Sequence, residues 1–214
     1  NCPVCQSELD LTAIQVQCKN PGCPSRVLGR IIVWCDNLRI HNLGSQTLET
    51  LQRYHLLDKG IRSLYKLKSK RSDIEDIPGF GQLSARKIIA EVEAKRRLKD
   101  YEVFGSLGIE SLSVKTFQMV FSNIPYQVFI DTVNDRQWDE LRRLVSSLDG
   151  IGDKKTEILV EWLKDPINRK ELTKLLEELS VQPSFGSTGQ LRQIVFTGFR
   201  DRDLAEELGK RGWE

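Results

Sequence analysis

Four cysteines near the start of the chain have the residue type and the spacing of a metal site. Cys2 and Cys5 are separated by two residues, Cys18 and Cys23 by four, and twelve residues lie between the two pairs. Two close pairs of thiolates joined by a short loop match the four soft ligands of a tetrahedral zinc ion. Residues 20–22, Asn-Pro-Gly, supply turn chemistry inside the second pair. The spacing therefore predicts a structural zinc ion held by these four thiolates.

Two disulfides or a set of reactive thiols are the alternatives to zinc for these cysteines. The stretch that contains them is too short to bury a core of its own, which favours a metal ion as the source of its stability. Because all four positions are cysteine, none is left for the water of a catalytic zinc. Cys35 lies in the apolar run IIVWCDN, and we expect it to be buried rather than to bind metal.

A short pattern then repeats four times along the chain. The four triplets are Asn42-Leu43-Gly44, Gly79-Phe80-Gly81, Ser111-Leu112-Ser113 and Gly150-Ile151-Gly152. The positions four and seven residues after each triplet are mostly apolar: Leu48, Ala85, Phe117 and Thr156, then Leu51, Ile88, Val120 and Leu159. This spacing marks one face of a helix. Each unit is therefore predicted to be a helix, a tight turn and a second helix, and strand signals are nearly absent between residues 36 and 180.

The turns have features that suit phosphate binding. Glycine permits a positive φ and lets another backbone come close, and a helix N-terminus offers free N–H groups with partial positive charge. Basic residues follow three of the turns. The candidate DNA contacts are Asn42, Gly44, Gly79, Gly81, Arg86, Lys87, Lys115, Gly150, Gly152, Lys154 and Lys155. Ordinary turns in a helical bundle are the alternative, and the basic runs KLKSKRS and EAKRRLK fit phosphate contacts or solvated helix faces equally well.

Composition limits the classes of partner. The 32 basic and 30 acidic residues leave a net charge of +2, so any attraction to nucleic acid must come from local patches. No apolar run approaches the roughly 18 residues that span a membrane. Residues 181–190, rich in Ser, Gly and Pro, are predicted to be a linker. A strand and an amphipathic helix are expected after it, too few elements for a domain.

Several motifs carry a resemblance to known families. DIPGFGQLSARKI and LDGIGDKKTEI resemble the helix-hairpin-helix motif, which binds DNA backbones without sequence preference. IVFTGFRDRDLAEELGKRGW is similar to the first strand and helix of a BRCT domain, with Thr197-Gly198 as its early turn. Together with CPVC, CKNPGCPSR, LRIHNLGSQTLETL, LYKL and FGSLGIESL, the order of motifs resembles the C-terminal part of a bacterial-type NAD-dependent DNA ligase over nearly the whole chain. Ser111 and Ser113 depart from the family pattern, which expects glycines there.

The resemblance implies a mainly α fold with five regions. They are a four-cysteine zinc finger (1–30), helix-hairpin-helix units 1 and 2 (31–100), units 3 and 4 (101–180), the linker (181–190) and an incomplete α/β BRCT segment (191–214). Because Asn1 is not an initiating Met and the BRCT-like part is short, we expect a piece of a longer protein.

The resemblance also implies a function. The full enzyme seals nicks in double-stranded DNA, using NAD and Mg, in the cytoplasm near the nucleoid or in a viral equivalent. A lysine in a Lys-x-Asp-Gly motif takes AMP, but these 214 residues contain no such motif. The segment is therefore expected to bind neither NAD nor Mg, to be inactive alone, and to position DNA for adenylation and oligonucleotide-binding domains on the same or a partner chain. A stand-alone DNA-structure-binding repair scaffold and a protein-interaction module are the competing hypotheses.

Overall fold

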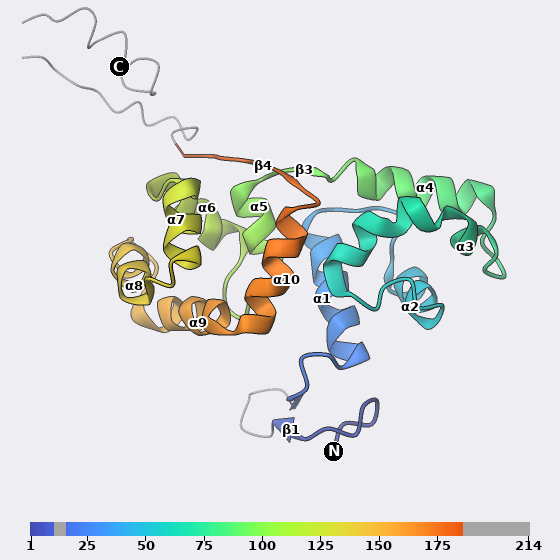
Figure 1. The fold of residues 1–214 in the computed structure, drawn as a ribbon, viewed down its shortest axis with the longest axis horizontal. Coiled ribbons are helices and arrows are strands. Elements are labelled where there is room, and N and C mark those ends of the chain that lie inside the picture. The colour runs from blue at the N-terminus through green and yellow to red at the C-terminus, as the bar shows by residue number, and fades with distance from the viewer. Residues whose placement is uncertain (11–15, 186–214) are drawn as a thin grey trace, which may run out of the picture.

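A helical body and a small cysteine-bearing module make up the described part of the protein (Figure 1). The structure is a computed structural model that describes residues 1–10 and 16–185. Within these residues, strands are limited to two short pairs. β1 (Leu9–Asp10) pairs antiparallel with β2 (Gln17–Cys18), and β3 (Arg97–Lys99) pairs parallel with β4 (Ser180–Gln182). The predicted mainly α class is confirmed, and the BRCT-like segment 191–214 lies outside the described residues.

The helices follow one another with short connections. They are α1 (Pro24–Asn37), α2 (Ser45–Arg53), the 3-10 helix η1 (Gly60–Lys70), α3 (Arg71–Glu75), α4 (Gln82–Glu93), α5 (Asp100–Gly105), α6 (Val114–Asn123), α7 (Tyr126–Asn134), α8 (Trp138–Ser146), α9 (Asp153–Lys164) and α10 (Pro166–Leu176). None of these helices combines the length and apolar character needed to cross a bilayer.

Each of the four triplets joins two helices that pack against each other. We name these turns hairpin 1 (residues 40–44, between α1 and α2), hairpin 2 (77–81, α3 and α4), hairpin 3 (109–113, α5 and α6) and hairpin 4 (148–152, α8 and α9). The side chains four and seven residues after every triplet are buried, as the helical spacing predicted. The repeat therefore follows from burying one face of each second helix.

One continuous apolar core runs through all four units. In the first half, Trp34 on α1 meets Tyr65 on η1 edge to face at 6.4 Å, and its Nε1 donates a hydrogen bond to the Tyr65 hydroxyl at 3.2 Å. In the second half, Phe104, Phe121 and Phe129 form a cluster with ring centroids 5.2–5.3 Å apart. Aromatic pairs of this kind add stability beyond the area that they bury.

The last elements of the described residues, α10 and β4, pack against the first half. Figure 1 shows α10 between α1 and the group formed by α5 to α9. Arg30 on α1 pairs with Glu171 on α10 at 3.2 Å, and the Ser180 N–H donates to the Arg96 carbonyl at 2.7 Å. The short strand β3 departs from the helical prediction, because its partner β4 lies some eighty residues away and pairs only in the fold.

The segment expected to be a linker begins inside this packed region. Ser184 is buried, and its Oγ and N–H donate hydrogen bonds to the Asp100 carboxylate at 2.5 and 2.8 Å. Asp100 is fully buried at the start of α5 and also accepts from the Tyr101 N–H at 2.8 Å. A buried carboxylate needs such donors, so residues 180–184 are held against the helical body.

One helix joins the cysteine-bearing module to the helical body. The predicted boundary between residues 30 and 31 falls within α1, which runs unbroken from Pro24 to Asn37. Cys23 is the residue that precedes its first turn. The position of the module is therefore set by the same helix that leads into hairpin 1 (Figure 1).

Candidate metal centre and nucleic-acid interface

The structure brings the four predicted metal-binding cysteines together. Their sulfur atoms all lie within 4.8 Å of one another, with 3.8 Å between the Cys2 and Cys23 sulfurs and 3.4 Å between those of Cys5 and Cys18. A tetrahedral zinc ion with Zn–S bonds of about 2.3 Å separates its sulfurs by about 3.8 Å. The geometry and the soft donor set therefore fit a zinc ion, and the four cysteines could hold one.

Local structure on both sides positions these sulfurs. The β1–β2 pair places Leu9 opposite Cys18. In the second pair, the Asn20 side chain accepts a hydrogen bond from the Gly22 N–H at 2.9 Å, which is the predicted turn. Arg26 on α1 donates to the Cys18 carbonyl at 2.8 Å and so ties the loop to the helix.

The thiols of the chain differ in their acidity. Hydrogen bonds from the side chain and backbone of Ser7 lower the pKa of Cys5 to about 6. Burial raises the pKa of Cys18 to about 12. Cys35 lies apart from the cluster, and burial raises its pKa to about 12 as well. The prediction that Cys35 is a buried apolar residue is confirmed.

The first residue of every triplet adopts a positive φ. The values are 61° at Asn42, 86° at Gly79, 60° at Ser111 and 81° at Gly150. In hairpins 2, 3 and 4 the middle residue donates its N–H to the carbonyl three residues earlier, at 2.8–3.1 Å. This combination defines a type II turn, which requires a positive φ at its third position. The sequence signal thus identified real turns, including the one with serine.

The last residue of every triplet caps the following helix and has extended backbone angles. Gly44, Gly81 and Gly152 therefore do not need glycine for a positive φ. A Cβ added at any of the three would meet no atom within 4 Å. All three are exposed, and no side chain caps α2, α4 or α9. Neither strain nor crowding inside the protein explains these glycines, so each leaves an open approach to free N–H groups at a helix start.

Hairpin 3 differs because it satisfies its own helix start. The Ser113 hydroxyl accepts a hydrogen bond from the Thr116 N–H at 3.3 Å, and the Thr116 hydroxyl accepts from the Ser113 N–H at 3.4 Å. This reciprocal arrangement is a capping box. Side chains here satisfy N–H donors at the helix start, which no side chain does in hairpins 1, 2 and 4.

Hairpins 1 and 2 together line one hollow of about 350 Å³. Asn42 from hairpin 1 and Gly79 from hairpin 2 face it, and Lys87 on α4 adds a cation. Thr47 and Ser84 also line it, and each lies three residues after the glycine cap of its helix. Sequence reasoning missed these two hydroxyl residues, although their shared position in the repeat was a usable signal.

The predicted DNA-contacting cations are not neutralised by the protein. Within the described residues, no ion pair involves any member of this set: Arg86, Lys87, Lys115, Lys154 and Lys155. Four of them are exposed, and Lys155 is half-buried. Their charges are therefore free for an external anion.

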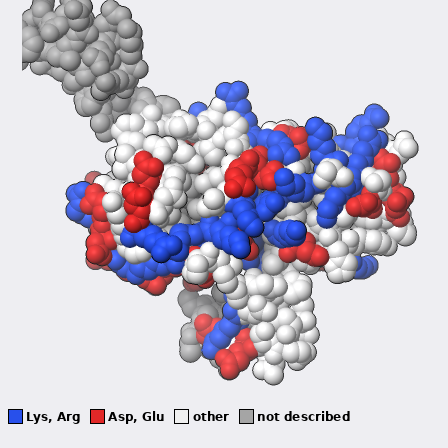
Figure 2. Space-filling model, viewed as in Figure 1, with Lys and Arg blue, Asp and Glu red and all other residues white. Residues whose placement is uncertain are grey.

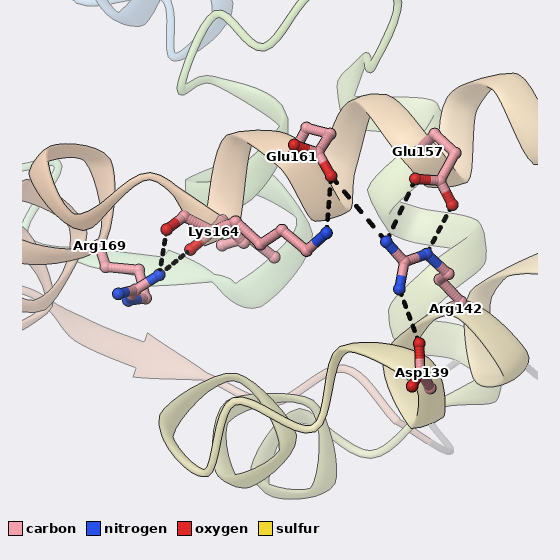
Figure 3. A network of polar contacts seen from close by, with 7 residues as sticks. Asp139, Arg142, Glu157, Glu161, Lys164 and Arg169 are labelled. Atoms are coloured by element: carbon pink, nitrogen blue, oxygen red, sulfur yellow. Dashed lines mark hydrogen bonds and ion pairs between the residues drawn. The ribbon is translucent and has the colours of Figure 1, made fainter.

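Other cations near hairpin 4 are paired internally (Figure 3). Arg142 on α8 donates to Glu157 on α9 at 2.6 Å and to Asp139 at 2.8 Å. The hydrogen bond from Arg142 lowers the pKa of Glu157. Arg169 donates to two carbonyls at the end of α9 and so caps that helix. These cations hold α8, α9 and α10 together.

The two basic runs of the sequence are also partly internal. Burial alone would raise the pKa of Glu178, but Lys66 at 2.5 Å, Arg62 and Arg96 hold it below its ordinary value. Arg96 also donates to the carbonyls of Tyr65 and Glu178 at 2.6 and 2.9 Å. Basic residues from both runs therefore hold η1, the end of α4 and the end of α10 together.

Gly105 is a structural residue that the sequence did not reveal. A Cβ on it would lie 2.3 Å from the Cα of Val114 and 2.6 Å from the Val114 nitrogen. Only glycine fits this crossing of α5 and α6. The repeat in the sequence consists of the four triplets, and Gly105 lies outside them.

Comparison with known proteins shows which proteins this chain is similar to. The chain is 27% identical to a protein named DNA ligase from Acidiphilium cryptum, over 99% of the chain and 33% of that relative. It is 29% identical to DNA ligase from Coprothermobacter proteolyticus (92% and 29%) and 30% identical to DNA ligase from Aquifex aeolicus (98% and 29%). The chain is related to one segment of the bacterial DNA ligases.

The extent of the match agrees with the predicted relationship. The chain spans about a third of the length of these relatives, which is consistent with a C-terminal segment of a bacterial-type ligase. No protein-family model matches the chain. The ligase-related segment thus consists of a cysteine cluster that could hold a metal ion and four helical units.

Proposed function

We propose that this segment binds nicked double-stranded DNA as part of an NAD-dependent DNA ligase. The glycine-capped hairpins 1, 2 and 4 hold backbone phosphates, whatever the base sequence. One observation supports this most directly: these glycines cap open helix starts and have no role in strain or packing inside the protein. The unpaired Lys and Arg beside hairpins 2 and 4 add the charge that a phosphate backbone attracts.

The contribution of the segment to catalysis is positioning. It keeps the duplex in place while a lysine elsewhere takes AMP from NAD and passes it to the 5′-phosphate of the nick, after which the 3′-hydroxyl displaces AMP. Holding two DNA ends in reacting geometry removes much of the entropic barrier to joining them. With no Lys-x-Asp-Gly motif in these residues, we expect no AMP transfer to the purified segment; labelled adenylate on this chain would contradict that expectation.

The decisive experiment adds a side chain at an open cap while keeping the cap. In Gly81→Thr and Gly152→Thr, threonine is a favourable cap residue and fits the extended backbone, but its branched side chain occupies the phosphate approach. We expect each to weaken binding of a labelled nicked duplex by about tenfold, or about 1.4 kcal/mol, with an unchanged melting temperature. Ser113→Thr in hairpin 3 is the matched control, since it changes a cap that is already filled.

Salt dependence separates the two DNA-binding hypotheses from the protein-interaction module. The logarithm of the affinity for duplex DNA should fall against that of the salt concentration, with a slope of about 0.9 per neutralised phosphate. A stand-alone scaffold predicts the same slope, but it would act without the domains that carry out ligation. A protein-interaction module has no salt-sensitive affinity for DNA, and that result, or normal binding by Gly81→Thr and Gly152→Thr, would remove the hairpins from the interface.

We also propose that the cysteine cluster binds a structural zinc ion. Zinc content should be about one per chain, and Cys5→Ser should abolish it. Cys35→Ala is the control, because this buried cysteine lies outside the cluster. Chelation should expose residues 1–23 to proteases before the helical body. Equal zinc content in both variants, or proteolysis unaffected by the chelator, would contradict the metal site.

A further inference from the structure

A groove of about 500 Å³ separates α10 from the start of η1. It is bounded by α1 on one side and by the end of α9 on the other. Among the described residues, none of the four triplets lines it. Its volume lies within the range of sites that hold a compact ligand or a few side chains of a peptide. The groove is therefore a separate surface from the hairpins.

The inner surface of the groove is largely apolar. Ile61, Trp162 and Ile167 are only partly covered, and Ile167 keeps 47% of its surface exposed. Leu107 and Leu172 are buried beneath them. An apolar depression rimmed by polar groups marks an interaction site. A DNA backbone gains little from the apolar floor of this groove, because a phosphate binds N–H donors and cations and not apolar side chains.

The rim of the groove is cationic. Five basic residues border it: Arg30, Lys59, Arg62, Lys170 and Lys174. Figure 2 shows Lys and Arg gathered in a band across the face on which α9 and α10 lie. Arg30 is paired with Glu171, the acidic residue of the lining, at 3.2 Å.

The remaining charge is unbalanced. Arg62 belongs to the cluster around Glu178, whereas Lys59, Lys170 and Lys174 form no ion pair within the described residues. The rim therefore favours an acidic partner, while the floor favours one with apolar side chains.

We propose that this groove docks a short acidic peptide segment of a protein partner, with one or two large apolar side chains as anchors. The anchors fill the floor beside Trp162 and Ile167, and Asp or Glu side chains on either side meet Lys170, Lys174 and Lys59. Charge complementarity of this kind sets specificity and association rate, while a buried apolar anchor supplies most of the affinity. The proposal is independent of the DNA-binding role of the hairpins.

The test uses two labelled peptides of equal charge. The first is fluorescein-Glu-Asp-Leu-Phe-Asp-Glu-Trp-Leu-Glu-Asp, and in the second every Leu, Phe and Trp is replaced by Ser. Fluorescence anisotropy should give at least about tenfold tighter binding of the first peptide. Lys170→Glu with Lys174→Glu should weaken that binding severalfold, and Ile167→Ser, at an exposed position, should do the same without loss of thermal stability.

Lys68→Glu with Lys70→Glu is the matched control, because it makes the same charge change on η1 outside the groove. It should leave peptide binding nearly unchanged. Equal binding of the two peptides, no binding of either, or an equal effect of the control variant would overturn the proposal. So would a loss of duplex affinity in Lys170→Glu with Lys174→Glu as large as that in Gly81→Thr, because the groove would then be a DNA surface.

Discussion

Hairpins 2, 3 and 4 have the same type of turn, but hairpin 3 differs from the other two in how the start of the following helix is capped. All three have a positive φ at the first triplet residue and a buried or half-buried middle residue. In hairpin 3, Ser113 and Thr116 satisfy each other's backbone N–H groups, whereas no side chain caps the helices that follow Gly81 and Gly152. The same fold thus supports a closed turn that stabilises the protein and an open turn that suits an external anion.

The glycines near these hairpins show the same difference. Gly105, beside hairpin 3, is required by the close approach of Val114. Gly81 and Gly152 have no neighbour that a Cβ would meet. A glycine in this chain therefore either allows close packing inside the protein or leaves a helix start accessible from outside. The atoms around the position show which of the two applies.

The largest expected effect concerns the internal glycine. Gly105→Ala places a Cβ against the Val114 backbone, which must shift, so we expect a loss of at least about 1–3 kcal/mol of stability and a lower melting temperature by calorimetry. Gly29→Ala is the control, because Gly29 lies in α1 with no atom within 4 Å of a new Cβ. This variant should be slightly more stable, since alanine is favoured over glycine in a helix by about 1 kcal/mol. If both variants melt alike, the crossing of α5 and α6 is looser than described.

A smaller effect is expected from the cations. Lys154→Ala with Lys155→Ala should reduce the salt slope of duplex binding by about 0.9 for each phosphate that the variant no longer neutralises. Lys115→Ala, the equivalent cation after hairpin 3, should change the slope little, because the helix start beside it is already capped. A comparable reduction in Lys115→Ala would show that hairpin 3 also binds the backbone.

The smallest expected effect concerns the serine cap of hairpin 3. Ser113→Gly removes the serine cap of α6 and should cost only a few tenths of a kcal/mol, since glycine is itself an acceptable cap. The freed N–H groups should raise duplex affinity slightly, as measured by titration at low salt. Ser113→Ala loses the cap at a cost of about 1 kcal/mol and keeps a Cβ in the approach, so it should not gain affinity; an equal gain from both would argue against phosphate binding at the opened cap.

The local features of this protein could be predicted from its amino-acid sequence. Cysteine spacing identified the thiolates that meet within 4.8 Å, and the repeat located the turns and the buried faces of their second helices. These features depend on neighbours within a few residues, where backbone geometry relates position directly to direction.

Which charges are unpaired and which glycines are uncrowded depends on how the helices pack. Arg96 belongs to a basic run that suited phosphate, yet it is held by Tyr65 and Glu178, far apart in the sequence. The crossing at Gly105, the pairing of β3 with β4 and the groove beside α10 likewise bring distant segments together. Charge pairing and close packing depend on distances of a few ångströms in space, and those are fixed only when the helices pack.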